Sequence, residues 1–190
     1  MIPSAAIESA HLIGRLDRLM RSGVAVEGLN PAQWEALRYL ARANRFSRTP
    51  AGLADYLGST RGTVSQTLIA LEQKGFAVRM ASERDRRSTE LALTRRGVAA
   101  LKRDPLLLLA EDIAAAGVGG GEELLAALQA VLRNTVRRNN GRPFGVCHSC
   151  RHFRKAARDS AASPHHCALL DEPLSDADSH GICIEQESAA

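Results

Sequence analysis

Apolar residues recur three or four positions apart through most of the first 140 residues, which places them on one face of successive helices. The spacing predicts helices over about residues 5–22, from Pro31 to Ala41, near Pro50–Leu57, from Ser59 or Thr60 to Gly75, over 95–116, and from Glu122 to about Arg138. Asn30, and either Ser59 or Thr60, are suited to cap helix N-termini, and Pro31 suits a first turn. Pro105 predicts a distortion within 95–116.

Two short alternating segments, Phe76–Met80 and Thr89–Thr94, predict strands joined by the charged loop SERDRRS. Helix, turn, helix and then a hairpin with a basic tip is the order of a winged helix-turn-helix. The sequence therefore predicts a mainly α fold with a small β-hairpin wing. Asn139–Gly141 and Pro143 mark a boundary, which divides the chain into a domain over 1–140 and a small, loop-rich tail over 141–190.

The charge is spread unevenly between these two parts. Residues 1–140 carry 20 Lys and Arg against 14 Asp and Glu, and residues 141–190 carry 5 against 7. The larger, basic part is the one expected to meet an anionic partner. No run approaches the roughly 18 apolar residues of a membrane helix, and the N-terminus lacks a secretory pattern. We therefore expect a cytoplasmic protein with no membrane partner.

The stretch STRGTVSQTLIALEQKGFAVRMASERDRRSTELALTRRG resembles the recognition helix and wing of MarR-type (multiple-antibiotic-resistance) regulators. ERDRRSTELALTRRG carries most of the likeness: an Asp-x-Arg wing tip, an alternating strand, and Leu-Thr and Gly opening the next helix. The helix order over about residues 5–138 also fits. The resemblance implies a DNA-binding transcriptional regulator, not an enzyme, in which the first and last helices form a homodimer interface. Two recognition helices would then meet a pseudo-palindromic operator in double-stranded DNA.

The residues support DNA binding independently of that resemblance. If Val64, Leu68 and Leu71 are buried, the side chains expected toward the exposed face and the N-terminal end are Thr60, Arg61, Thr63, Ser65 and Gln66. Hydroxyls, amides and a guanidinium there can reach phosphates and base edges in the major groove. The wing offers Arg84, Asp85, Arg86 and Arg87 to the minor groove. The alternative reading is that these residues form helix caps and a solvated charged loop.

All four cysteines lie in the tail, spaced Cys147-x2-Cys150-x16-Cys167-x15-Cys183. In a reducing compartment such a group is expected to hold a metal. Structural zinc ribbons usually present two Cys-x2-Cys pairs. Here one pair is followed by Cys167 and Cys183, both expected on loops. We therefore predict an iron–sulfur cluster on these four thiolates, with Zn²⁺ as the alternative. The nearby histidines are expected to be exposed, although His166 could replace a thiolate.

The cluster would make the tail a sensor of redox state, iron or nitric oxide. The hypothesis is that the loaded tail packs against the terminal dimerisation helices and fixes the spacing of the recognition helices. In the alternative, a zinc staple is structural and a separate small molecule is the signal. A thiol oxidoreductase using Cys147 and Cys150 lacks the expected βαβ pattern. An architectural DNA-binding role stays open. The acidic residues Asp171, Glu172, Asp176 and Asp178 are expected to form a solvated loop. The alternatives are that they repel DNA or touch the basic domain when the tail changes state.

Overall fold

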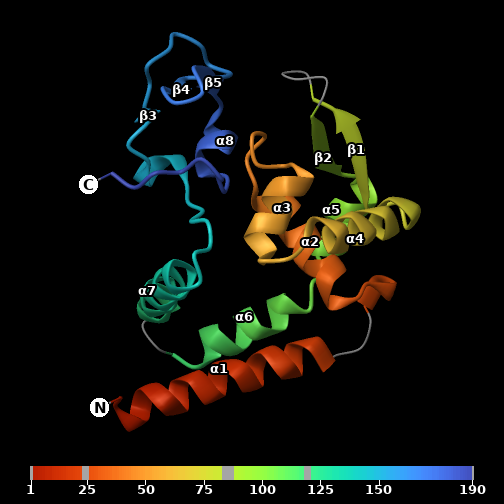
Figure 1. Ribbon diagram of the computed structural model, residues 1–190, viewed down its shortest axis with the longest axis vertical. Coiled ribbons are helices and arrows are strands. Elements are labelled where there is room, and N and C mark those ends of the chain that lie inside the picture. The colour runs from red at the N-terminus through yellow and green to blue at the C-terminus, as the bar shows by residue number, and fades with distance from the viewer. Residues whose placement is uncertain (1, 23–25, 83–87, 118–120, 190) are drawn as a thin grey trace.

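Helices dominate the computed structural model, together with two small antiparallel sheets (Figure 1). The structure describes residues 2–22, 26–82, 88–117 and 121–189. The fold class predicted from the sequence, mainly helical with a β-hairpin wing, is confirmed. In these ranges, no helix combines the length and the apolarity that crossing a lipid bilayer requires.

The winged-helix unit follows the predicted order of elements. A short turn of 3₁₀ helix, η1 (Val26–Gly28), precedes α2 (Pro31–Arg42), α3 (Pro50–Leu57), α4 (Arg61–Gln73), β1 (Ala77–Ala81), β2 (Thr89–Leu93) and α5 (Arg95–Leu101). The two strands pair antiparallel, from Ala77 opposite Leu93 to Ala81 opposite Thr89. Fully buried side chains from α2, α3, α4, α5 and β2 fill the core, together with Phe76 just before β1. The largest are Tyr39, Phe76, Leu37, Leu40, Leu53, Leu68, Leu71 and Leu91.

Polar N-caps fix where three of these helices begin. The side chains of Asn30, Thr49 and Thr60 each accept a hydrogen bond from a backbone N–H in the first turn of α2, α3 and α4. Such N–H groups have no partner within their own helix, so each cap contributes roughly 1 kcal/mol. Gly58 ends α3 in the left-handed region, at φ 58°, which a glycine adopts without strain. The turn between α3 and α4 is therefore defined from both sides.

The helix predicted over 95–116 is divided in two, which corrects the sequence prediction of a single distorted helix. α5 ends at Leu101, and α6 (Leu106–Ala115) begins after Pro105. Asp104 accepts a hydrogen bond from the Leu106 N–H at 2.8 Å. It also forms a two-pronged ion pair with Arg38 of α2, at 2.7 and 2.6 Å. Proline cannot continue the hydrogen bonding of α5, and Asp104 stabilises the new start.

The terminal helices α1 (Ser4–Ser22) and α7 (Glu122–Arg138), together with α6, contain no buried residue. Their large apolar side chains are exposed in the single chain, including Leu12, Ile13, Leu16, Leu19, Leu107, Leu108, Leu125, Leu128, Val131 and Leu132. Apolar side chains repeated along helices in this number are typical of a protein–protein contact surface. In Figure 1 these helices occupy the lower part of the molecule.

The tail folds around a sheet of its own. Its elements are the 3₁₀ turn η3 (Cys147–Ser149), β3 (Phe153–Arg154), β4 (His165–Cys167), β5 (Glu172–Leu174) and α8 (Asp176–His180). The strands form an antiparallel sheet in the order β3-β4-β5. Cys167 was expected on a loop, but it ends β4, opposite Phe153 on one side and Glu172 on the other. The sequence did not predict this strand, because β4 is only three residues long and its pairing partners lie elsewhere in the chain.

Candidate nucleic-acid interface and cysteine cluster

α4 presents a polar face to solvent and an apolar face to the core. Val64, Leu68 and Leu71 are buried, as predicted. Of the five residues predicted to face DNA, four are exposed and Ser65 is half-buried; they are Thr60, Arg61, Thr63, Ser65 and Gln66. The Thr60 hydroxyl accepts from the Thr63 N–H at 3.1 Å and lies 2.8 Å from the Thr63 hydroxyl. Thr60 therefore holds the start of the helix, while Arg61 and Gln66 extend from its exposed side.

The wing is tied to α4 by Arg79, a residue that the sequence analysis did not single out. Its Nη2 donates to the Ser65 carbonyl at 3.3 Å, and its Nε lies 3.4 Å from a Glu72 carboxylate oxygen. The signal available in the sequence was a basic residue, Arg79, in a strand that follows a helix containing the acidic Glu72. The predicted wing-tip residues, Arg84, Asp85, Arg86 and Arg87, lie outside the described residues.

Three segments of the tail bring the four cysteines together. Cys147 and Cys150 flank η3, where the Cys150 N–H donates to the Cys147 carbonyl at 2.8 Å. Cys183 exchanges backbone hydrogen bonds with Gly145, at 2.7 and 3.3 Å. Cys167 pairs with Phe153, shortly after Cys150 in the chain. The Cys-x2-Cys turn is therefore the centre around which the two later cysteines are placed.

The four thiols are close enough to influence one another electrostatically. Burial, together with the neighbouring Cys183, Cys150 and Cys167, raises the pKa of Cys147 to about 12. Burial also raises the pKa of Cys183, against a hydrogen-bond contribution from Asn44 that lowers it. All four are free thiols. Each of these thiols therefore disfavours ionisation of the others.

The side chains are not spaced to hold one metal ion. No group of three or more Cys, His, Asp or Glu side chains in the described part of the chain has that spacing. His166, the predicted substitute ligand, lies 3.3 Å from Asp171 instead. His165 was expected to be exposed but is buried, where its Nδ1 accepts from the Ala156 N–H at 3.0 Å and its Nε2 lies 2.8 Å from Asp176. His165 therefore supports the fold of the tail.

The tail docks on the connection between α2 and α3. The Ile182 N–H donates to the Arg42 carbonyl at 2.7 Å, and the Asn44 N–H donates to the Ile182 carbonyl at 2.9 Å. One residue beyond Cys183, the Ile184 N–H donates to the Ser47 hydroxyl at 2.9 Å. Both neighbours of Cys183 are thus hydrogen-bonded to the winged-helix unit.

Charged and aromatic side chains add to this junction. Arg45 lies 3.5 Å from Glu172 and 3.9 Å from Asp178, and it donates to the Pro173 carbonyl. The acidic segment 171–178 thus touches the basic domain, one of the alternatives to the solvated loop expected from the sequence. Phe144 packs edge-on against Tyr56 with ring centres 5.2 Å apart.

These contacts correct the predicted docking of the tail on the terminal helices. In Figure 1 the tail lies at the upper left, with α8 next to α3, while α1 runs along the lower edge. The physical reason is that the connection after α2 offers free backbone N–H and C=O groups, which α1 and α7 have already used within their own helices.

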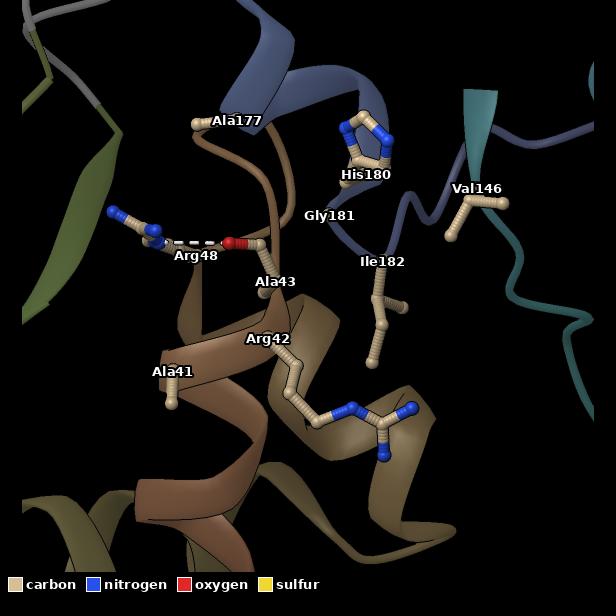
Figure 2. A pocket seen from close by; sticks show the side chains of 9 residues that line it. All are labelled: Ala41, Arg42, Ala43, Arg48, Val146, Ala177, His180, Gly181 and Ile182. Atoms are coloured by element: carbon tan, nitrogen blue, oxygen red, sulfur yellow. Dashed lines mark hydrogen bonds between the residues drawn. The ribbon is translucent and has the colours of Figure 1, made fainter. Parts of the chain in front are cut away.

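An open pocket of about 300 Å³ borders the junction (Figure 2). It is lined by Arg42, Ala43 and Arg48 on one side and by Val146, His180 and Ile182 on the other, among others. In Figure 2 the ring of His180 and the side chain of Ile182 stand across from the connection.

Comparison with known proteins supports the assignment of the winged-helix unit. Residues 27–88 match the model of the MarR family. This segment contains α2, α3, α4 and β1. It does not include the tail, which begins well after residue 88. This part of the chain, about a third of its length, is therefore similar to the MarR family. No curated protein matches the chain.

Solved structures agree in fold over most of the chain. A MarR transcriptional regulator from Methanosarcina mazei Go1 is 21% identical, with a TM-score of 0.56, over 71% of this chain and 99% of that one. The repressor CouR, bound to a 23-mer DNA duplex, is 26% identical, with a TM-score of 0.52, over 70% and 99%. A mutant of S. aureus MepR is 18% identical, with a TM-score of 0.54, over 70% and 99%.

These proteins are matched over nearly their whole length by about 70% of this chain. The remainder is similar in size to the tail over 141–190. The family match and the structures together support a winged-helix fold similar to that of MarR-family regulators. They have no bearing on the four cysteines.

Proposed function

We propose that this protein is a DNA-binding transcriptional regulator of MarR type whose tail holds an iron–sulfur cluster on Cys147, Cys150, Cys167 and Cys183. The observation that carries the proposal is the gathering of four free thiols on a segment bonded to the helix-turn-helix. The cluster would make operator binding respond to redox state, iron or nitric oxide. Free thiols suit a reducing compartment, so the proposed location is the cytoplasm.

The DNA partner is proposed from the exposed face of α4. Arg61 can bond a guanine at two acceptors, Gln66 can bond an adenine, and Thr63 can reach a phosphate. The wing arginines over 84–87 would enter the adjacent minor groove. CouR, which shares the fold, was solved on a DNA duplex. The same docking in this chain would place α4 in the major groove.

A homodimer is proposed from the terminal helices. The apolar side chains of α1, α6 and α7 are exposed in the single chain, and a second copy would cover them. A two-fold dimer presents two recognition helices to a pseudo-palindromic operator with half-sites about one helical turn apart.

The sequence spacing of the cysteines favours a cluster over zinc. Structural zinc sites usually present two Cys-x2-Cys pairs, whereas here one pair is followed by two separate cysteines, Cys167 and Cys183. Four dispersed thiolates suit a cluster. Cys147 and Cys183 are buried while Cys150 and Cys167 are half-buried, so the occupant would lie near the surface, open to small oxidants.

The regulatory route proposed here runs through the α2–α3 connection. Residues on both sides of Cys183 bond to it, and on its other side the Arg48 carbonyl accepts from the Leu91 N–H of β2 at 2.7 Å. A change in the thiolate site would therefore shift a segment that also holds the wing strand. Its effect on operator affinity would be a coupling free energy between two sites.

The test begins with protein purified without oxygen. Iron, acid-labile sulfide and absorption near 400 nm, the region expected for thiolate-bound clusters, would support the proposal. Operator affinity of the loaded and stripped protein should then differ, and a variant with all four cysteines changed to serine should lose that difference. Stoichiometric zinc without sulfide would make the tail a structural staple. In that case a separate small-molecule signal would be the alternative. Identical operator affinity in every state would refute the switch.

A further inference from the structure

Basic residues of the tail gather at the end of β3 and on the connection from β3 to β4. Arg154, Lys155 and Arg158 lie there within five positions, and all three are exposed. We call these three residues the basic loop. The tail as a whole carries more acidic than basic residues, so this concentration of positive charge runs against its overall balance.

The carboxylates of the tail contact basic groups outside the basic loop, with one exception. The contacts are Glu185 with Arg142, Glu187 with Arg151, Glu172 and Asp178 with Arg45, Asp176 with His165, and Asp171 with His166. The exception is Asp159, which directly follows Arg158. Across the residues that the structure describes, the basic loop forms no ion pair. Its charge is therefore available to a partner.

The backbone of the basic loop is held by groups of the tail. The Ala156 N–H donates to the ring of the buried His165 at 3.0 Å. The Arg158 N–H donates to the Pro164 carbonyl at 3.1 Å, across the connection. A partner would therefore not have to order this backbone when it binds, which lowers the entropic cost of the contact.

The tail carries the basic loop on the same side of the molecule as the wing. Ile182 and Ile184 bond the tail to the connection before α3. In Figure 1 the connection from β3 to β4 reaches the upper edge of the picture, and β1 and β2 extend toward that edge as well. A duplex that meets α4 and the wing continues beyond them, and its phosphates form an unbroken line of negative charge.

We propose that the basic loop binds phosphates of double-stranded DNA beside the segment that α4 and the wing contact. Lysine and arginine bind phosphates without reading bases, so the contact would add affinity but no sequence preference. An acidic protein suits the loop less well, because protein interfaces place aromatic and other apolar residues at their core and residues 154–163 contain no large apolar side chain. This inference rests on the proposed DNA binding and is independent of the cysteines.

The test measures binding of the full chain to a mixed-sequence duplex of about 40 base pairs, roughly four helical turns, over a range of salt concentrations. The variant combines Lys155→Gln with Arg158→Gln. Arg154 stays, because its guanidinium donates to backbone carbonyls of the tail. Each contacted phosphate adds about 0.9 to the slope of log affinity against log salt. Loss of two contacts should therefore make that slope shallower by about 1.8 for each bound subunit.

Two further double variants separate the contact from its alternatives. Lys102→Gln with Arg133→Gln removes the same charge from exposed positions on α5 and α7, and it should keep the wild-type slope. Lys155→Arg with Arg158→Lys keeps both charges of the basic loop and should also keep that slope, which an effect of the substitutions on folding would not do.

A wild-type slope in the glutamine variant of the basic loop would overturn the inference and favour an acidic protein as the partner. An equal loss in the variant of α5 and α7 would also overturn it, since net charge alone would then explain the effect. In both cases DNA binding by α4 and the wing is left standing. If the wild type binds no duplex at any salt concentration, the proposed DNA binding fails first and this inference with it.

Discussion

Gly181 packs against the backbone of Asn44 so closely that a Cβ atom at position 181 would lie 2.8 Å from the Asn44 nitrogen. The absence of a side chain at Gly181 lets the tail reach the α2–α3 connection, where Ile182 forms its two backbone hydrogen bonds. The contact between the cysteine cluster and the winged helix therefore depends on a residue that has no role in ligand binding.

Gly181→Ala should separate the tail from the winged helix while leaving all four cysteines in place. If the switch operates, operator Kd values of loaded and stripped wild type should differ about 5- to 150-fold, the usual range of allosteric coupling. In the variant this ratio should fall toward unity with the cluster content unchanged. Gly141→Ala is the control, because a Cβ there meets nothing closer than Val136, at 3.3 Å. A ratio in Gly181→Ala equal to that of the wild type would mean that the signal takes another route.

The ion pair between Arg38 and Asp104 should make stability depend on pH in a defined direction. Burial raises the pKa of Asp104, but hydrogen bonds from Arg38 and Leu106 outweigh it and hold that pKa below its usual value. A lowered pKa in the folded state stabilises the protein above the unfolded-state pKa of about 3.9. This stabilisation is lost as the pH falls through the folded-state pKa.

Asp104→Asn should therefore cost roughly 1.5–3 kcal/mol at pH 7, the range for hydrogen bonds to charged groups. The difference in free energy of unfolding between variant and wild type should shrink below about pH 4. Asp17→Asn is the control, since the Asp17–Arg21 pair is 57% exposed on both sides and such pairs contribute about 0.2–1 kcal/mol. Denaturant unfolding across the pH range measures both, and a difference that persists undiminished in acid would argue against the assigned cause.

The winged helix could be predicted from the sequence because its signals are local. Asn30, Thr60 and Gly58 sit next to the helix ends that they define, and the apolar spacing of α4 needs no distant partner. The split after α5 was underestimated because its second cause, the pair between Arg38 and Asp104, joins elements far apart in the sequence.

For the four cysteines of the proposed site, the surroundings could not be predicted from the sequence. The four cysteines were evident from their spacing, whereas the docking of Ile182 on Arg42 and the approach of Asn44 to Cys183 arise from backbone groups and a buried amide. Neither of these two contacts produces a periodic or compositional pattern in the sequence. Arg79 was missed for the same reason, because its bond to Ser65 exists only after the wing has folded onto α4.

Arg61→Ala should weaken binding to the specific operator by about 1–3 kcal/mol and relax the preference for one base pair, as expected for loss of a base contact. Lys102→Ala removes one positive charge at an exposed position at the end of α5, away from the recognition helix, and should change affinity little. Binding titrations on the operator and on single-base variants separate the two effects. Equal losses on every sequence would reassign Arg61 to a phosphate.

The cysteines of the stripped, reduced protein should differ in their rates of alkylation. Burial and the neighbouring thiols raise the pKa of Cys147 to about 12, so its reactive thiolate is scarce at neutral pH. Cys150 and Cys167 are only half-buried and should be modified first by iodoacetamide. Mass spectrometry of timed samples gives the order, and loading the site should protect all four. Rapid alkylation of Cys147 ahead of Cys150 would contradict the burial seen here.

Leu16→Glu should dissociate the proposed dimer. Leu16 is 44% exposed on α1, near Leu12 and Leu19, which are also exposed in the single chain. If a second copy covers this face, the substitution buries an unpaired carboxylate, which is strongly unfavourable. Sedimentation at micromolar concentration should then show monomers with the winged helix still folded, and operator affinity should fall because one recognition helix holds only one half-site. Arg18→Glu on the same helix is the control for the added negative charge. It should leave the dimer largely intact if Arg18 lies at the rim of the interface. A wild type that is itself monomeric would remove the dimer from the proposed mechanism.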